Sequence, residues 1–579
     1  MITIWEPHAP QATTDGPTEL SAGGLNLSIY NGVATYKTIE DGVIEIEATG
    51  NGPVRIDWRF PCTAATAYWS PEGSSSRWLP AAWMKPHANT LARGSAVGSL
   101  IGTGDKNICS FAAMETEAMV SAGVIEELGE FRVWIQAENN LTVRIDTSDK
   151  HYAQSLASFA AWWGEGKSYH VPSAARKPAY STWYSMHQNI SPEGVESQAK
   201  LAKEVGCEVI IVDDGWMTTD RTRGYGHCGE WNPISLPDTA AHVARVHDIG
   251  LEYMLWYAIP FVGWDSPVWD KFKDYGLRNL EHMQAIVVDP RYPMVREYLA
   301  ERLSRAVSEW GMDGLKVDFV DWFATPDAPV AGPEADCADV SEGVQRLLSE
   351  VHARITAANP EAMVEHRQPY VSHGLWPYTS MIRATDCPLS PHENRQRIAD
   401  LRMTQGPLAI HADMLMWHTE ETPEQVAVHL INVLFSVPQI SVALETQSPE
   451  QIATIKFWLG IFSKYEDLLQ LSIIEPARPE LGYPMIRGAH GDAVVVARYA
   501  PLPISVPESG WSTFLVANAD ADSQVILTGG PAAEVRATVQ DSQGREVTSE
   551  MVSFEQNVAT VSVPLGGLLT LSIDGAEGA

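Results

Sequence analysis

Three sequence patterns are not found: closely spaced cysteine pairs, the charge and hydropathy pattern of a leader, and a long apolar run. Its six cysteines are scattered over 579 residues without a Cys-x-x-Cys motif, which fits free thiols in a reducing compartment rather than a disulfide framework or a zinc site. Residues 1–7 contain no basic segment leading into an apolar stretch, so we expect no signal peptide and a cytoplasmic location. No run of 18 apolar residues occurs, so no membrane span is predicted.

Positive charge is scarce as well. The chain has 40 Lys and Arg against 73 Asp and Glu, a formal net charge of −33, and no Lys/Arg-rich run. Nucleic acids and anionic membranes are therefore poor partners. A nucleotide-dependent enzyme is also disfavoured, because no GxxxxGK[ST] motif occurs and the glycines of 102–106 lack its spacing. Whether the protein forms a homo-oligomer is left open.

Short alternating apolar and polar runs fill both ends of the chain. Val43–Ala48 and Phe131–Gln136 are examples near the start, and Ala493–Arg498 and Leu568–Ile573 are examples near the end. Alternation with a period of two, interrupted by Gly, Asn and Pro, is typical of antiparallel sheets. We predict an N-terminal β-sandwich at 1–170 and a smaller C-terminal β-sandwich domain at 475–579.

Between these regions, over 171–474, apolar runs alternate with helix-like stretches. The expected strands are Ser181–Tyr184, Glu208–Val212, Leu251–Trp256, Gly314–Phe319, Ala362–His366, Met381–Thr385, Leu408–His411 and Gln439–Ala443. The expected helices include Glu193–Val205, Thr239–Ile249, Pro293–Trp310, Ser341–Ala358 and Asn394–Met403. Eight such units in roughly 300 residues predict an α/β fold whose centre is a (β/α)8 TIM barrel.

The fourth expected strand carries a lysine and an aspartate on one face. Lys316 and Asp318 are two residues apart, so their side chains point the same way. Such a face is unfavourable in a core but suits a polar pocket, where an ionised aspartate can attack an electrophilic carbon. A structural ion pair at a strand end is the alternative for this segment.

Polar and aromatic side chains end six further strands. A TIM barrel has its active site at the carboxyl ends of its strands, so these groups should meet. They are Trp183 and Tyr184, Asp213 and Asp214, Trp256 and Tyr257, Glu365 to Gln368, Arg383 and Asp386, and His411 and Asp413. Each alone is ordinary: Asp-Asp-Gly is usually a turn, and His411-x-Asp413 lacks further metal ligands. Together, acids and flat aromatics suit a sugar.

The ordered set resembles glycoside hydrolase family 36, the α-galactosidase family. The segments that carry the resemblance are Ser181–Tyr184, Val212–Trp216, Gly229–Pro233, Gly250–Trp256, Leu315–Asp318 and Arg383–Asp386. The sandwich, barrel and C-terminal β domain follow the family's layout, so the resemblance covers most of the chain. It implies a retaining mechanism without a metal or organic cofactor.

Roles follow from the matched motifs. The Lys-x-Asp match implies that Asp318 is the nucleophile, and the Arg-x-x-Asp match implies that Asp386 is the general acid/base. Asp213 and Asp214 match the pair that holds the sugar's O4 and O6 hydroxyls. The remaining matched positions contact or border the sugar: Trp183, Tyr184, Trp231, Trp256, Lys316 and Arg383. We expect Lys316 and Arg383 to favour the charged Asp318, and burial near Asp318 to raise the pKa of Asp386. Retention predicts carboxyl groups about 5–5.5 Å apart.

One position departs from the family pattern. After the fifth strand, where the family commonly has a small residue or Cys facing the sugar's O2, this chain has the bulky cation Arg367. It either pairs with Glu365 or another acid, or selects a different substrate, such as another α-glycoside or an acidic sugar. Cys387-Pro-Leu-Ser-Pro391 likewise replaces the usual acid-rich run after Asp386.

The leading hypothesis is a retaining exo-α-glycosidase, most simply an α-galactosidase, with an α-linked glycoside as its substrate. A glycosyl transferase of the same family differs only in using a second sugar in place of water, and the loops near Trp322 and Trp376 could form its acceptor site. A carbohydrate-binding protein without turnover is disfavoured because both Asp318 and Asp386 are present.

Overall fold

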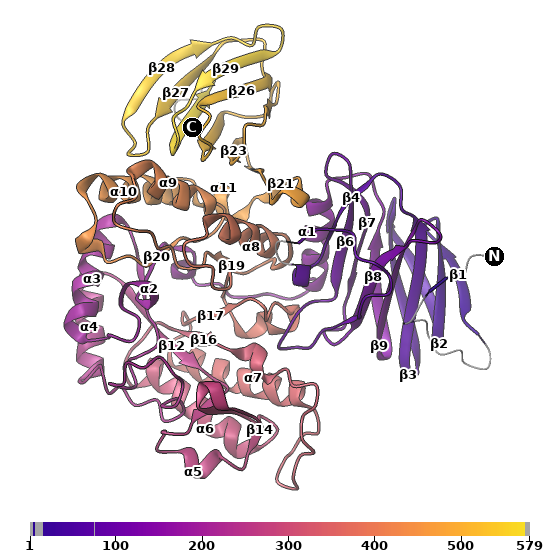
Figure 1. The fold of residues 1–579 in the computed structure, drawn as a ribbon, viewed down its shortest axis with the longest axis vertical. Coiled ribbons are helices and arrows are strands. Elements are labelled where there is room, and N and C mark those ends of the chain that lie inside the picture. Colours follow the sequence, from indigo (N-terminus) through magenta and orange to yellow (C-terminus); the bar gives the residue numbers. More distant parts are fainter. Residues whose placement is uncertain (1–3, 6–7, 9–15, 74–75, 574–579) are drawn as a thin grey trace.

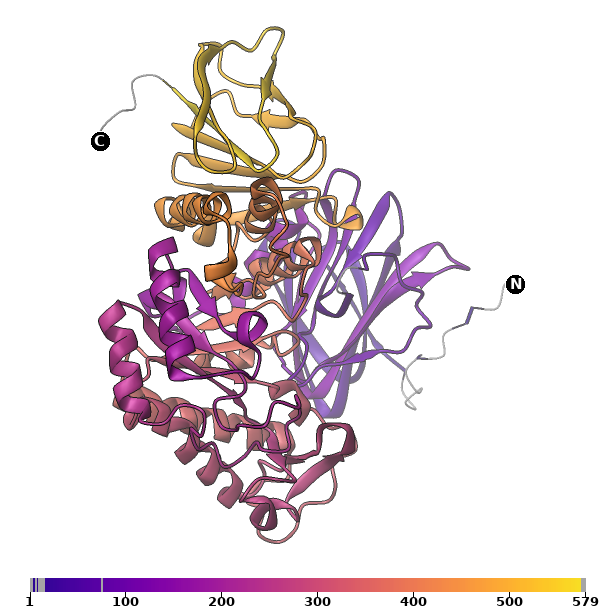
Figure 2. The same cartoon turned by 60° about the vertical axis from the view of Figure 1, so that its left-hand side comes forward.

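The computed structural model describes residues 4–5, 8, 16–73 and 76–573. It has three regions: an N-terminal β-rich region, a central barrel surrounded by helices, and a C-terminal pair of sheets (Figure 1). The C-terminal sheets lie against the last helices of the barrel region, and Figure 2 shows the same stacking from another side. Most of residues 1–7, on which the signal-peptide prediction rests, lie outside the described residues.

Eight parallel strands form the central sheet, in the order β19-β18-β17-β16-β12-β11-β10-β20. Their bounds are β10 (Ala179–Ser181), β11 (Val209–Val212), β12 (Glu252–Ala258), β16 (Gly314–Asp318), β17 (Met363–Arg367), β18 (Met381–Arg383), β19 (Ala409–His411) and β20 (Gln439–Ile440). A parallel bridge from His411 to Val437 joins the two ends of this order. The predicted (β/α)8 architecture is therefore confirmed.

Several of the helices that cover the barrel begin directly after an N-capping residue. Ser191, Asp339 and Ser390 each accept a backbone N–H three residues ahead, and a proline follows two of them, as helix starts favour. The helices of the barrel region are α2 (Trp183–Met186), α3 (Pro192–Val205), α4 (Thr239–Ile249), α5 (Trp269–Phe272), α6 (Pro293–Ser308), α7 (Val340–Ala358), α8 (Pro391–Thr404), α9 (Pro423–Asn432), α10 (Pro449–Lys464) and α11 (Glu466–Leu471). The five predicted helices are confirmed to within three residues.

The first predicted strand is wrong in its second half. The strand ends at Ser181, and Trp183 and Tyr184 start the short helix α2 instead. The backbone turns at Thr182, whose hydroxyl accepts the N–H of Asp213 on the next strand. The apolar and aromatic run of this segment suggested a longer strand because it contains no Gly or Pro to mark the turn.

An antiparallel three-stranded sheet interrupts the barrel between β12 and α6, which the sequence did not predict. It consists of β13 (Phe261–Gly263), β14 (Gly276–Leu280) and β15 (Ala285–Val288), with β15 in the middle. Phe261 of this sheet packs against Phe319, the residue after Asp318, at a ring distance of 5.0 Å. The insertion therefore supports the end of β16.

Side-chain alternation fills the barrel in layers. One apolar cluster joins residues that share one parity on their strands: Ala179, Val209, Ile211, Met254, Met363, Met381 and Ala409. Two residues further toward the carboxyl ends of the strands, the same inward face carries Lys316, Glu365, Arg383 and His411. The apolar layer therefore closes one end of the barrel, and charged groups fill the other.

The N-terminal region is one sheet that divides at its last strand. Its strands are β1 (Thr18–Ala22), β2 (Leu25–Glu40), β3 (Val43–Pro61), β4 (Ala65–Trp69), β5 (His87–Ala88), β6 (Val97–Gly102), β7 (Lys106–Ala113), β8 (Met119–Ile125) and β9 (Glu130–Asp146). One edge of β9 pairs with β3, and its other edge pairs first with β8 and then with β7. The two halves enclose an apolar core. Helix α1 (Tyr152–Trp163) leads from this region to the barrel.

The C-terminal region has two facing sheets around a shared apolar core. Its strands are β21 (Ile473–Ala477), β22 (Met485–His490), β23 (Ala493–Arg498), β24 (Ile504–Val506), β25 (Thr513–Asn518), β26 (Gln524–Gly529), β27 (Val535–Gln540), β28 (Glu546–Val552), β29 (Val558–Ser562) and β30 (Gly567–Ser572). The limits 1–170, 171–474 and 475–579 stay predictions. No helix among the described residues is long and apolar enough to cross a membrane.

The contacts that hold the N-terminal region against the barrel include a shared buried carboxylate and a backbone hydrogen bond. Asp400 of α8 accepts hydrogen bonds from Trp69 Nε1 (2.8 Å), Arg77 Nη2 (2.5 Å) and the Tyr483 hydroxyl (2.7 Å), so one buried carboxylate joins all three regions. The N–H of Gly94 donates to the carbonyl of Pro369 at 3.0 Å, two residues beyond the end of β17. The segment around Gly94 therefore lies at the carboxyl end of the barrel.

Candidate active site

The structure gathers the predicted site residues at the carboxyl end of the barrel. Seven of them are buried: Asp213, Asp214, Trp231, Trp256, Lys316, Asp318 and Arg383. Trp183, Tyr184 and Arg367 are half-buried, and the Asp386 side chain is 55% exposed. Trp231, which is 1% exposed, differs because it lies behind Trp256 at a ring distance of 6.2 Å. It supports the site from behind and presents no open face.

Asp318 ends β16 and is held by donors on both carboxylate oxygens. Arg367 Nε lies 2.6 Å from Oδ1, and Trp256 Nε1 donates to Oδ2 at 3.0 Å. Burial alone would raise the pKa of Asp318, but the charges of Arg367, Lys316 and Arg383 outweigh it and lower this pKa to about 2. Asp318 is therefore an ionised carboxylate that is only 8% exposed.

The backbone beside Asp318 is strained. Phe319 has a φ of +65°, which a side chain with a Cβ rarely adopts, and its N–H donates to Asp318 Oδ1 at 2.7 Å. This sharp turn ends the strand and leaves the Asp318 carboxylate at the top of the barrel.

Lys316 does not form its closest ion pair with Asp318. Its Nζ lies 2.6 Å from Asp213 Oδ2 on β11, and both side chains are buried. The expectation that Lys316 favours the charged Asp318 is correct, since its charge still lowers the pKa of Asp318. The larger contribution comes from Arg367, so the prediction that Arg367 pairs with a barrel acid holds, with the nucleophile candidate as that acid.

Asp214 behaves in the opposite way to Asp318. Burial and the charge of Asp213 raise the pKa of Asp214 to about 7, although Gln188 Nε2 donates to its Oδ2 at 2.7 Å. Its Oδ1 is buried without a hydrogen-bond partner in the structure. A buried acceptor without a partner is unusual, which marks Asp214 as a candidate for a functional role. Gly215 (φ +110°) allows the turn, because a Cβ there would lie 2.5 Å from the Gln188 Cα.

Arg383 links the remaining acids. Its Nη1 lies 2.6 Å from Asp413 Oδ1, its Nη2 3.0 Å from Asp386 Oδ1, and its Nε 3.5 Å from Glu365 Oε1. The predicted raised pKa of Asp386 is wrong for this structure. Desolvation and the Asp318 charge do raise it, as expected, but the charges of Arg383, Lys316 and Arg367 together outweigh both, and the pKa of Asp386 is lowered.

Beneath these acids lies a buried network of Glu365, His411 and Asp413, which were expected at the strand ends but given no role, together with Gln439, which was not predicted. Asp413 accepts from the Tyr184 hydroxyl at 3.2 Å as well as from Arg383, and burial raises its pKa to about 6. Gln439 Nε2 donates to Glu365 at 2.5 Å and lies 3.1 Å from His411 Nδ1. His411 Nε2 lies 2.7 Å from the Ala175 carbonyl, so both of its ring nitrogens have protein partners. Inward parity on β19 and β20 is the sequence signal that could have placed these residues in the network.

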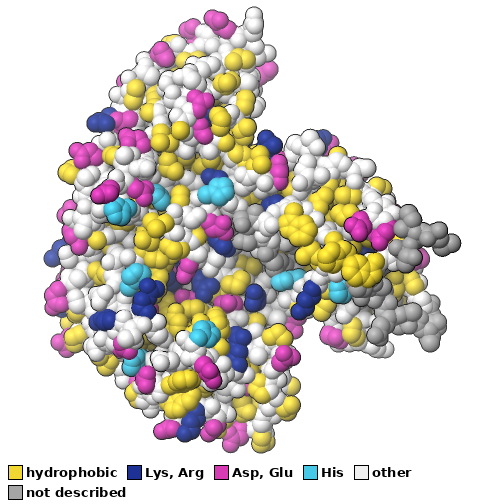
Figure 3. All heavy atoms as spheres, in the orientation of Figure 1, with side chains coloured by type: hydrophobic (Ala, Val, Ile, Leu, Met, Phe, Trp, Pro, Cys, Tyr) yellow, Lys and Arg dark blue, Asp and Glu magenta, His cyan; other side chains and the backbone are white. Residues whose placement is uncertain are grey.

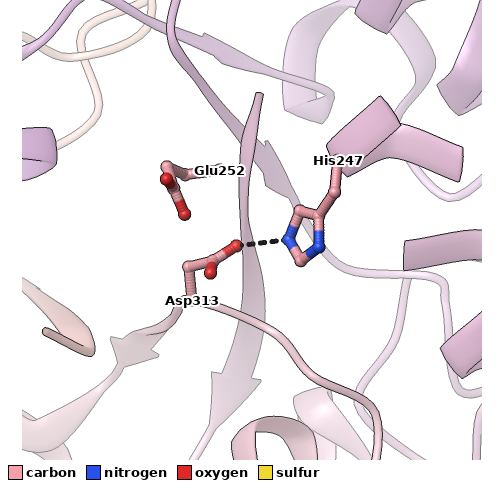
Figure 4. Close-up of side chains that lie close together, drawn as sticks. All are labelled: His247, Glu252 and Asp313. Atoms are coloured by element: carbon pink, nitrogen blue, oxygen red, sulfur yellow. Dashed lines mark hydrogen bonds and ion pairs between the residues drawn. The ribbon is translucent and has the colours of Figure 1, made fainter. Parts of the chain in front are cut away.

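A separate group of possible metal ligands lies at the opposite end of the barrel strands. His247 ends α4, Glu252 starts β12, and Asp313 precedes β16 (Figure 4). His247 Nε2 lies 2.7 Å from Asp313 Oδ2, which also accepts the Tyr253 N–H. Burial and a hydrogen bond with Asp313 raise the pKa of Glu252 to about 7. The group fastens α4 to the sheet and contacts none of the predicted site residues.

A buried ionised carboxylate and a second, solvent-facing carboxyl at the open end of a barrel are what cleavage of a glycosidic bond requires. Fold and site thus define the class as a barrel-type glycoside hydrolase. Residues 173–365, about a third of the chain, match the Melibiase family model. The matched range ends at Glu365, so it contains Asp318 but not Asp386.

Curated relatives match parts of the chain. The α-galactosidase AgaA of Geobacillus stearothermophilus is 23% identical over 185 residues, which are 30% of this chain and 25% of AgaA. The A type blood α-D-galactosamine galactosaminidase of Flavonifractor plautii is 24% identical over 224 residues, 35% of this chain and 20% of that protein. The matched segments thus span a quarter or less of these relatives' length.

Solved structures match nearly the whole chain. The crystal structure of AgaA superposes with a TM-score of 0.63 at 14% identity and covers 97% of this chain and 86% of AgaA. The α-galactosidase TtGalA from Thermus thermophilus, in complex with stachyose, gives a TM-score of 0.54 at 18% identity and covers 76% of this chain and 99% of TtGalA. These likenesses show a shared fold, including flanking β-rich regions.

Proposed function

We propose that the protein is a retaining exo-acting α-galactosidase that uses Asp318 as nucleophile and Asp386 as acid/base. The observation that carries the proposal is the state of Asp318, which is buried and ionised at the open end of the barrel with a pKa lowered to about 2. The melibiase-family domain and the α-galactosidase relatives support the reaction class.

The first step forms a covalent ester. An Asp318 oxygen attacks the anomeric carbon, the bond to the leaving oxygen breaks with its electron pair, and that oxygen takes the proton of Asp386. The Trp256 and Arg367 donors hold the carboxylate in place for the attack. In the second step water attacks the same carbon, Asp386 takes its proton, and Asp318 leaves as a carboxylate. Two displacements at one carbon retain the α-configuration.

The environment of Asp386 fits the change of role from acid to base. The Asp318 charge raises the pKa of Asp386 in the free enzyme, and ester formation removes that charge. The charges of Arg383, Lys316 and Arg367 then act on Asp386 without the opposing Asp318 charge, which favours its carboxylate form, the form that a base requires. In the free enzyme the Arg383 guanidinium already lowers this pKa, so the protonated form increases as the pH falls. The acid-dependent step is therefore favoured below neutral pH.

The proposed sugar contacts are Asp213, Asp214 and the aromatic residues around them. Asp214 Oδ1 has no protein partner, as expected of an acceptor for the O4 or O6 hydroxyl. Trp183 is half-buried beneath the Arg223 guanidinium at 5.0 Å from its ring, so one face of it is occupied. Because the Arg367 charge is balanced by Asp318, the argument that Arg367 selects an acidic sugar next to the nucleophile is weakened.

A panel of 4-nitrophenyl α-glycosides tests the proposal. The galactoside should be cleaved faster than the glucoside, the N-acetylgalactosaminide and a hexuronide, and NMR should show the α-anomer of the sugar first. Prompt release of a β-anomer would overturn the retaining mechanism. Product analysis at a high concentration of an acceptor sugar separates hydrolysis from glycosyl transfer. The cytoplasmic location remains a proposal, supported by the six cysteines, all of which are free.

A further inference from the structure

Two cavities lie where the N-terminal region meets the carboxyl end of the barrel, and both are lined by Arg93. The inner cavity, about 430 Å³, is also lined by Gln368 and Thr385. The outer cavity, about 940 Å³, is also lined by Lys85 and Arg278. Both volumes lie within the usual range of ligand sites. Because they share Arg93, we treat them as one groove, called here the interregion groove.

The inner part of the groove adjoins the two proposed catalytic residues. Gln368 follows Arg367, the ion-pair partner of Asp318, and Thr385 precedes Asp386. The N–H of Thr385 donates to Gln368 Oε1 at 3.3 Å, so the two strand ends meet at this wall. A leaving group that takes its proton from Asp386 therefore lies next to the interregion groove.

The N-terminal region presents Arg93 to this groove on a fixed turn. Thr90 and Arg93 exchange two backbone hydrogen bonds, and the N–H of Gly94 donates to the Pro369 carbonyl. The Arg93 side chain is exposed and forms no hydrogen bond or ion pair with the described residues. A rigid backbone that carries a guanidinium without a protein partner suits recognition of an external group.

Two further cations in the outer part form no ion pair among the described residues, although the charge of Asp321 acts on both Arg278 and Arg93. The Arg278 guanidinium lies over the Trp322 ring at 4.8 Å and donates to the Trp322 carbonyl at 2.8 Å, which leaves its buried Nε without a partner. Lys85 is exposed, and no ion pair is formed by it among the described residues. The other charged residues that line the outer cavity add no unpaired positive charge. Arg291 pairs with Asp289, Asp339 accepts the Glu342 N–H, and Glu117 is an exposed acid.

This concentration of cations runs against the composition of the chain. The protein carries a net charge of −33, so an anion meets repulsion over most of its surface. Figure 3 shows Lys and Arg side chains around the hollow between the barrel and the N-terminal region. Three cations of the groove form no ion pair among the described residues, which makes it a local site of attraction for an anion.

We infer that the interregion groove binds the part of the substrate beyond the scissile bond, and that this part is anionic. The substrate class is then an α-galactoside whose aglycone carries a carboxylate, sulfate or phosphate. Guanidinium groups bind all three by paired hydrogen bonds, so the groove recognises the negatively charged oxygens that they share. The inference rests on the proposed function.

The test compares two aryl α-galactosides with leaving groups of equal pKa, one bearing an anionic substituent and one a neutral substituent of similar size. The wild-type protein should prefer the anionic substrate in kcat/KM, and added salt should reduce the preference. R93Q and the double variant K85Q/R93Q should lower kcat/KM for the anionic substrate by roughly tenfold and leave the neutral one unchanged. K456Q removes an exposed charge on α10 and serves as the matched control.

Three substrates with carboxylate, sulfate and phosphate substituents separate the sources of the charge. Equal cleavage of anionic and neutral substrates by the wild type overturns the inference, and so does an equal loss on both in R93Q. If neither substrate is cleaved, the proposed function fails instead. Calorimetric binding of the free anionic aglycones to wild type and R93Q then decides the inference without turnover: binding lost in R93Q supports it, and no binding to wild type overturns it.

Discussion

The ends of two strands in one barrel, β11 and β16, hold aspartates of opposite character. Asp214 after β11 and Asp318 on β16 are both buried, at 3% and 8% exposure. Nevertheless the pKa of Asp214 is raised to about 7 and that of Asp318 is lowered to about 2. Burial raises both, so the difference comes from neighbouring charges.

Each environment has one decisive neighbour. Asp318 has the Arg367 guanidinium at 2.6 Å, whereas Asp214 follows Asp213, whose like charge opposes ionisation. Asp213 itself takes Lys316, the cation that the sequence pattern assigned to Asp318. The barrel thus distributes its few cations so that one buried acid is permanently charged and another exchanges a proton near neutral pH. Burial alone therefore does not decide which carboxyl group is the nucleophile.

Replacing the charged member of the pair should have the largest effect. D318N removes the nucleophile with little change in shape, so kcat for an aryl α-galactoside should fall by ~10⁴-fold or more. Steady-state kinetics on protein whose circular dichroism matches wild type is the measurement. A D318N variant with normal turnover would sink the double-displacement mechanism and leave the Asp318 environment a structural ion pair.

Asp386 is the third kind of acid, exposed and paired with one arginine. D386A should slow substrates with poor leaving groups by ~10²–10⁴-fold, because they need a proton at the leaving oxygen. Substrates with an acidic phenol as leaving group need no such proton in the first step. The measurement is the slope of log kcat/KM against leaving-group pKa, which should steepen in D386A. An unchanged slope would show that Asp386 is not the acid.

Removing Arg367 should raise the pKa of Asp318 toward that of Asp214. In R367Q, kcat should fall by ~10–100-fold, and its acid limb should move to higher pH by about 1–3 units, since Asp318 loses its nearest cation. The pH profile of kcat on an activated aryl galactoside is the measurement. R367K retains the charge and should move the limb less. If both variants move it equally, the geometry of the guanidinium matters more than its charge.

Much of this architecture could be predicted from the sequence. Parity placed Lys316 with Asp318 and Arg367 with Glu365, because side chains two apart share a face whatever the register of the strand. Helices α9 and α10 were missed, although Thr422 to Gln425 and Ser448 to Gln451 form complete capping boxes. The capping-box pattern is visible in the sequence and predicts the starts of both helices.

Contacts between distant segments could not be predicted. The pairing of Arg367 with Asp318 depends on the rotamer of a long side chain across two strands, and several acids were equally available to it. The placement of Arg93 depends on how the N-terminal sheet docks on the barrel, through Gly94 and Pro369, which are 275 positions apart in the numbering. Local pattern carries no information about such docking. The wrong direction expected for the pKa of Asp386 has the same origin, because the combined effect of Arg383, Lys316 and Arg367 depends on how their side chains are placed around it.

The smallest effect, in stability, tests the other member of the pair. The folded pKa of Asp214, about 7, exceeds the unfolded value of roughly 3.9. Between these pH values the native state binds more protons than the unfolded state, so the free energy of unfolding falls as the pH rises through this interval. D214N has no such proton to lose.

D214N should therefore have a Tm above that of wild type by about 2–5 °C at pH 8, with the difference vanishing near pH 4. Thermal unfolding of both proteins from pH 4 to pH 8 is the measurement. D213N is the matched control: it leaves Lys316 buried without its acidic partner, so its Tm should fall below wild type at pH 8. If D214N and D213N changed Tm in the same direction at pH 8, burial rather than neighbouring charge would govern both acids, and the contrast between the two strand ends would not hold.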